Sequence, residues 1–165
     1  MTTQLDIAAI KKQTRLALPE DDGYTFRLGM VLYGFASISS FMAEVSSYLD
    51  ADVDQTALQA ACGGVILTAF RKGVKKAKQS APAVVPHGRA AADLFQALNT
   101  RRSDIVHAYP ITSTSDEQIL HRRLDERNRH FDVNNEILDA FITKLHDVST
   151  SLYKIRAIVR PDLGD

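Results

Sequence analysis

The chain has 165 residues, 45% of them hydrophobic, which is long enough for one domain with a substantial core. Its 20 basic and 20 acidic side chains cancel, which excludes a strong overall field for nucleic acid and leaves such binding to a local patch or a dimer cleft. Because Cys62 is the single cysteine, a disulfide within the chain and a CxxC metal site are excluded, and we expect a buried thiol in a reducing compartment.

Residues 1–23 are predicted to form an N-terminal arm or a short helix, which ends at Pro19 to Gly23. Residues 24–160 are predicted to form a single helical domain. Its first helix covers residues 24–49, where apolar residues recur at spacings of three and four, and Asp21 or Asp22 is expected to cap it. Glycine, serine and glutamate interrupt the apolar stretch of this helix, so we expect no membrane span and a cytoplasmic protein.

Two more helices are predicted in the middle of the chain. One follows a cap at Asp52 or Asp54 and continues to a basic end near Lys78. The next begins near Pro86, since proline is tolerated in a first turn, and continues to about His107, shortly before another proline.

The last third of the chain is predicted to begin with a loop at 109–116. Two short segments, 119–124 and 129–133, flank the polar residues 125–128 and suit the strands of a short hairpin. Asn134 or Asn135 then caps a final amphipathic helix. The pattern predicts an all-α protein, an antiparallel bundle of four to five helices, with a short β-hairpin before the last helix as an option.

One segment near the end of the predicted third helix brings chemically capable side chains together. Ser103 and Asp104 lie four and three residues before His107, so each can share a helix face with it. Arg102 lies about 140° from His107 on a regular helix, on the core-facing stripe. A cation there must meet a carboxylate, extend past the core edge or line a cleft. Arginine binds phosphate and histidine transfers protons near neutral pH, which suits phosphodiester cleavage.

The sequence of residues 102–108, Arg-Ser-Asp-Ile-Val-His-Ala, resembles the RN-D-x-x-HA motif of small bacterial members of the HEPN superfamily. This superfamily is named for nucleotide binding in higher eukaryotes and prokaryotes. A structural interpretation stays open beside the resemblance. In it, Arg101 and Arg102 are last-turn cations that complement the helix dipole, and His107 caps the helix end.

The resemblance implies a metal-independent endoribonuclease that acts as a homodimer and leaves a 2′,3′-cyclic phosphate. His107 would be the general base or acid, Arg102 would hold the scissile phosphate, and Ser103 would take the position of the family's usual Asn, Asp or His. Arg101 and Asp104 are supporting candidates. The alternative is a catalytically inactive HEPN-like dimer that binds a nucleotide, RNA or a protein. By family analogy, the expected partners are RNA and an antitoxin or other partner protein of a toxin–antitoxin or defence pair.

Two basic regions are secondary candidates for RNA binding, although solvated surface is the simpler interpretation of both. The first contains Lys75 and Lys76, and the second contains Arg122 and Arg123. The five histidines show no HxxH, HxxxH or HExxH spacing. We therefore expect no metal and no cofactor.

Overall fold

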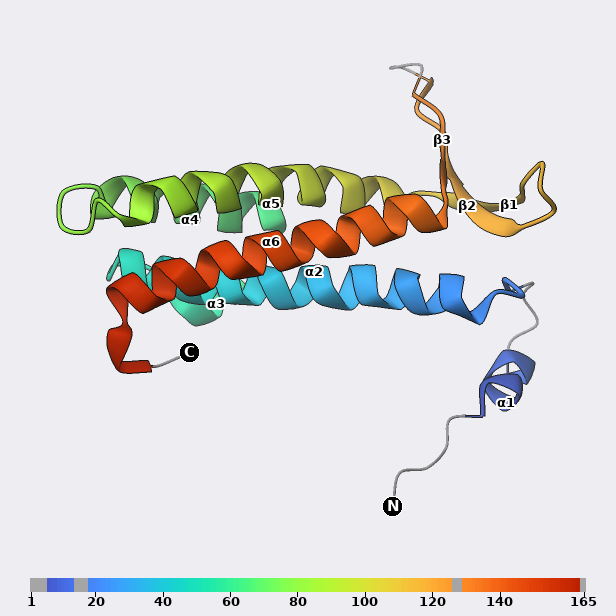
Figure 1. Ribbon diagram of the computed structural model, residues 1–165, viewed down its shortest axis with the longest axis horizontal. Coiled ribbons are helices and arrows are strands. Elements are labelled where there is room, and N and C mark those ends of the chain that lie inside the picture. Colours follow the sequence, from blue (N-terminus) through green and yellow to red (C-terminus); the bar gives the residue numbers. More distant parts are fainter. Residues whose placement is uncertain (1–5, 14–17, 126–128, 164–165) are drawn as a thin grey trace.

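The computed structural model of the chain describes residues 6–13, 18–125 and 129–163, which are predominantly helical (Figure 1). Apart from the helices, the described residues form a small antiparallel sheet before the last long helix. The prediction of a mainly helical chain is confirmed. In chain order the elements are α1 (Ile7–Lys12), α2 (Asp22–Leu49), α3 (Gln55–Gln59), α4 (Gly63–Ala77), α5 (Val84–Val106), β1 (Tyr109–Thr112), β2 (Gln118–Arg122), β3 (Phe131–Val133), α6 (Asn135–Val159) and the 3-10 helix η2 (Pro161–Leu163).

The four longer helices pack around one apolar core. α2 and α5 each contact both α4 and α6, and Figure 1 shows α2, α6 and α5 lying along one another. Three phenylalanine rings meet at the centre: the ring of Phe35 lies 5.3 Å from that of Phe95 and 6.5 Å from that of Phe141. The helical stripes in the sequence therefore account for the core.

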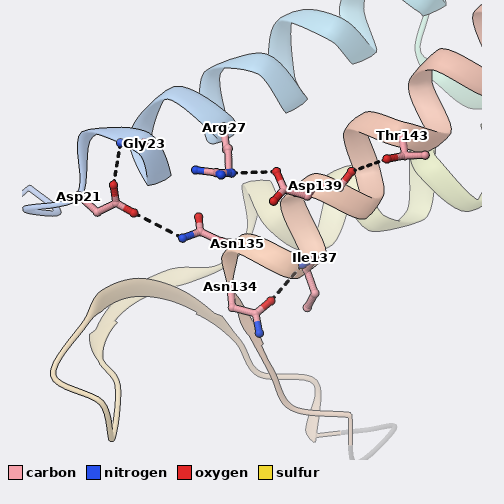
Figure 2. A network of polar contacts seen from close by, with 8 residues as sticks. All are labelled: Asp21, Gly23, Arg27, Asn134, Asn135, Ile137, Asp139 and Thr143. Carbon is pink, nitrogen blue, oxygen red and sulfur yellow. Dashed lines mark hydrogen bonds and ion pairs between the residues drawn. The ribbon is translucent and has the colours of Figure 1, made fainter.

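Side-chain caps begin α2 and α6 at the same end of the molecule. Asp21 accepts a hydrogen bond from the Gly23 backbone at 2.8 Å, and Asn134 accepts one from the Ile137 backbone at 3.0 Å, as the sequence predicts (Figure 2). Arg27 of α2 donates to Asp139 of α6 at 2.8 Å. The two helices therefore start together and point in the same direction.

The prediction of an antiparallel bundle is wrong for α4 and α6, which both point in the same direction as α2. The amide of Gln59 donates to Ser40 in the middle of α2, whereas Lys76, near the end of α4, pairs with Asp50 at the end of α2. α3 thus returns the chain to mid-helix before α4 begins. Of the four longer helices, α5 alone points in the opposite direction.

The predicted single helix after Asp54 is interrupted. Asp54 caps α3, and the chain then breaks at 60–62 before α4 begins. Cys62 is exposed at this break, so the prediction that it is buried is wrong. Gly63 lies directly against α5, where a Cβ atom would fall 2.5 Å from the Asn99 side chain. The break lets α4 start on the surface of α5. Because this contact is between residues distant in the chain, the spacing of apolar residues does not predict it.

The sheet has the strand order β1-β2-β3. β2 and β3 form the predicted hairpin, with Leu120 opposite Val133. The predicted loop at 109–116 is wrong for residues 109–112, which form β1 and pair with β2. Pro110 is tolerated because β1 is an edge strand, where one backbone donor is not required.

Tyr24 joins α2 to the end of the β2–β3 ladder. Its buried hydroxyl donates to the Val133 carbonyl at 2.8 Å and accepts from the Leu120 amide at 2.9 Å. The hydroxyl thus bridges the final residue pair of the ladder, and burial raises the pKa of Tyr24 above its ordinary value of 10.0. One side chain therefore fixes how the sheet sits on the helices.

We expect Tyr24→Phe to lower the free energy of unfolding by about 1–3 kcal/mol, because the Val133 carbonyl and the Leu120 amide lose their partner. Urea denaturation followed by circular dichroism measures the change. Tyr33→Phe, on the same helix but 77% exposed, is the matched control and should unfold like the wild type. Equal stability of all three proteins would contradict a structural role for the Tyr24 hydroxyl.

α2 is long and apolar enough to cross a membrane by length and composition alone, which the interrupted stretch in the sequence does not suggest. In the fold, 33% of its most apolar window is buried, and that face packs against α4 and α6. Val31, Phe35 and Met42 on this face belong to the core. The buried face of α2 therefore forms part of the core of the helical bundle.

Candidate functional site

The predicted motif lies where α4 no longer covers the bundle. α4 begins at Gly63, beside Asn99 of α5, so the last two turns of α5 extend beyond it. The first half of α2 extends beyond it too, because α3 ends near Ser40 and α4 begins only after it. We call this surface the α2–α5 face. Phe35 and Arg102 are in contact on it, and Leu28, Leu32 and Val106 belong to the same helix faces by their spacings of seven, three and four residues.

Arg102 lies on the core-facing stripe of α5, as its spacing predicts, yet its side chain is exposed. The guanidinium carbon lies 5.6 Å from the ring centroid of Phe35 on α2. The long stem therefore carries the charge past the core edge to an aromatic face. The cation is not buried, although its Cα lies on the apolar stripe. No ion pair or hydrogen bond of this guanidinium occurs within the described part of the chain.

His107 follows the last residue of α5 and is exposed. Its backbone amide donates to the Ser103 carbonyl at 3.1 Å, so regular helical hydrogen bonding reaches His107. The helix end is therefore not bent, and Arg102 and His107 diverge by about 140° within one chain. Among residues 6–13, 18–125 and 129–163, no partner of the imidazole is found. The side chain of His107 is thus not used as a cap.

The structure brings Arg122 of β2 to the end of α5. Its guanidinium donates to Asp104 at 3.4 Å and to the His107 carbonyl at 3.3 Å. Asp104 and Arg122 are largely buried, with 14% and 22% of their side chains exposed. Asp104 therefore anchors Arg122, and both hold the backbone of His107 against the sheet.

The remaining motif residues lie on different sides of α5. Ser103 is exposed and follows Arg102 directly on α5. Arg101 lies on the side of α6 and the sheet, with its guanidinium carbon 4.5 Å from the ring centroid of Phe131. Arg102 is therefore better placed than Arg101 for a ligand on the α2–α5 face.

The secondary RNA candidates differ in how free their charges are. Lys76 pairs with Asp50 at 2.5 Å and Asp52 at 2.9 Å, and Arg123 pairs with Asp125 at 2.8 Å. Lys75 lines a shallow groove of about 320 Å³ between α4 and α5, at the far end of the bundle from His107. Of the two lysines, Lys75 alone offers its charge to solvent.

A row of rings on the exposed face of the sheet was not predicted from the sequence. Tyr109 lies opposite His121, and His121 lies opposite Asp132. The imidazole of His121 also stacks on that of His130. Alternation of Tyr109 with Ile111 is the local signal for β1, but Pro110 between them favours a loop.

Comparison of the chain with models of protein families, with curated proteins and with solved structures finds no match. The functional argument therefore depends on the residues and their geometry.

Proposed function

We propose that the protein is a metal-independent endoribonuclease that acts as a homodimer of HEPN-like helical bundles. The observation that carries the proposal is that the side chains of Arg102 and His107 are exposed and unpaired within the described residues. Both side chains are exposed at the open end of the bundle, and no hydrogen bond or ion pair engages either within the described residues. A guanidinium and an imidazole that form no hydrogen bond or ion pair within the described residues have donors free for a ligand.

The chemistry assigns one role to each group. The imidazole of His107 takes the proton from the ribose 2′-hydroxyl or gives one to the leaving oxygen, since an ordinary histidine changes charge near neutral pH. The guanidinium of Arg102 binds two phosphate oxygens and stabilises the charge that develops on them. Ser103 contributes a hydroxyl beside them. Attack by the 2′-oxygen breaks the bond to the 5′-oxygen and leaves a 2′,3′-cyclic phosphate.

A second copy of the chain supplies the geometry that one copy lacks. Because α5 is regular to its end, Arg102 of one protomer works with His107 of the other across the dimer cleft. Leu32 and Val106 support this, since both are apolar and about half exposed on the α2–α5 face beside Arg102. By family analogy the dimer is a cytoplasmic toxin or defence protein with a protein partner.

A catalytically inactive binding module is the second candidate function. The observation that favours it is the divergence of Arg102 and His107 within one chain, together with Ser103 at a position where the family usually has Asn, Asp or His. In this version the same dimer cleft binds a nucleotide, RNA or a protein without cleaving it.

We expect the protein to cleave single-stranded RNA in the presence of EDTA and to leave a DNA of the same sequence intact. The 2′-hydroxyl is the nucleophile, so its absence removes the reaction, and no metal is needed. Gel analysis of the products with and without phosphatase detects the cyclic phosphate. The cyclic phosphate resists the phosphatase until acid opens the ring. RNA that stays intact, or equal cleavage of the RNA and the DNA, would contradict the proposed ribonuclease activity.

A further inference from the structure

The exposed face of the sheet carries a continuous row of three rings. Tyr109 of β1 meets His121 of β2 edge to face, with ring centroids 5.6 Å apart and planes at 65°. His121 stacks on His130, with centroids 6.3 Å apart and planes at 10°. Tyr109 is 45% exposed and the His130 side chain 37%, so both outer rings offer surface to solvent. We call these residues the ring row.

The middle ring of the row is held in a fixed orientation. Nδ1 of His121 lies 2.7 Å from a carboxylate oxygen of Asp132, its neighbour on β3. This contact places the proton of a neutral imidazole on Nδ1 and leaves Nε2 as a hydrogen-bond acceptor. The ring row therefore combines flat apolar surface with an oriented polar edge, and both kinds of contact suit a nucleobase.

The ring row lies beside the candidate catalytic residue. Tyr109 follows His107 by two residues, a reach of about 7 Å along the chain. Arg122, next to His121 on β2, donates to the His107 carbonyl and so ties the sheet to the end of α5. Arg123, the residue after Arg122, adds an exposed cation that is paired with Asp125 at 2.8 Å. A strand whose phosphate is held at His107 has its neighbouring bases near this surface.

The surroundings argue for single-stranded nucleic acid rather than for a metal ion. Among the described residues, no three His, Cys, Asp or Glu side chains are arranged to hold a metal. Sheet surfaces with exposed rings bind unpaired bases by stacking, and RNA-binding domains read single strands in this way. A duplex keeps its bases stacked inside and cannot offer them to the row.

We propose that Tyr109, His121 and His130 form a stacking site for unpaired bases of single-stranded RNA next to the scissile phosphate. The inference rests on the proposed ribonuclease function and adds the class of substrate and the residues that hold its bases. The site favours an unpaired strand over a duplex of the same sequence.

The test measures binding without chemistry, in the His107→Ala background, by fluorescence anisotropy with a labelled single-stranded RNA. Adding Tyr109→Ala or His121→Ala should weaken binding about 5- to 100-fold, the range for loss of one stacked base. Tyr109→Phe keeps the ring and should bind within about twofold of its parent. Tyr153→Ala is the matched control, since Tyr153 is also 45% exposed but lies on α6 against Phe41. Circular dichroism confirms that each variant is folded.

The outcomes separate this inference from the function on which it rests. If the wild type cleaves RNA but Tyr109→Ala and His121→Ala bind like Tyr153→Ala, the stacking site is wrong and the ribonuclease stands. If the wild type neither binds nor cleaves RNA, both are wrong. If duplex RNA binds as tightly as the single strand, the preference for unpaired bases is overturned.

Discussion

His107→Ala is expected to reduce RNA cleavage in EDTA by about 100-fold or more, the usual contribution of a general acid or base. Arg102→Ala should cause a similar loss, because the phosphate then loses its charged partner in the transition state. Both side chains are exposed and form no hydrogen bond within the described residues, so neither substitution should unfold the protein. Initial rates on a fluorogenic RNA measure the effect.

The controls for these variants come from the same chain. His146 is an exposed histidine on α6, so His146→Ala should cleave like the wild type. Arg102→Lys keeps the charge but loses the planar fork and should fall between the wild type and Arg102→Ala. Wild-type cleavage rates in both His107→Ala and Arg102→Ala would show that neither side chain takes part in the reaction.

A mixing experiment tests whether the two side chains cooperate across the dimer. Neither variant has an intact site alone, but a heterodimer of His107→Ala with Arg102→Ala keeps one cleft in which Arg102 of one copy faces His107 of the other. After unfolding and refolding together, about a quarter of the wild-type rate should return, since half of the dimers are mixed and each keeps one of its two Arg102–His107 pairs. Absence of recovery would contradict cooperation between copies.

Features that depend on near neighbours in the chain were predictable. Asp21 and Asn134 cap α2 and α6 as their positions indicate, because a cap is decided within three residues. The place of Arg102 on the core stripe of α5 also follows from spacing alone. Spacing leaves three arrangements for the guanidinium, and the contact with the ring of Phe35 selects the one in which the side chain extends past the core edge.

Features that depend on distant contacts were not predictable. The direction of α4 depends on the short α3 and on the approach of Gly63 to Asn99, and neither changes the apolar period. The open side beside Arg102 exists because α4 is too short to cover it. The ring row likewise depends on strand register, which brings Tyr109 to His121 across twelve residues of sequence.

The buried carboxylate of Asp50 pairs with Lys76, so the charge of this lysine is already engaged within the fold. Only 1% of the Asp50 side chain is exposed, at the end of α2, with the ammonium of Lys76 at 2.5 Å and that of Lys72 at 3.5 Å. The hydrogen bond from Lys76 holds the pKa of Asp50 below its ordinary value of 3.8. A depressed folded-state pKa contributes stability above the unfolded pKa, and this contribution is lost as pH falls through the folded value.

Lys76→Met should lower the melting temperature by several degrees at pH 7, because it leaves a buried charge with a weaker partner. As pH falls below the ordinary value of 3.8 and through the lower folded-state pKa of Asp50, the carboxyl takes up a proton, so the difference from the wild type should shrink. Adding Asp50→Asn should recover much of the loss at pH 7, since the uncompensated charge is then gone. Lys75→Met, one residue away and exposed, is the matched control and should melt like the wild type. A loss equal in Lys75→Met and Lys76→Met, or one that does not change with pH, would show that the pair does not stabilise this end of the bundle.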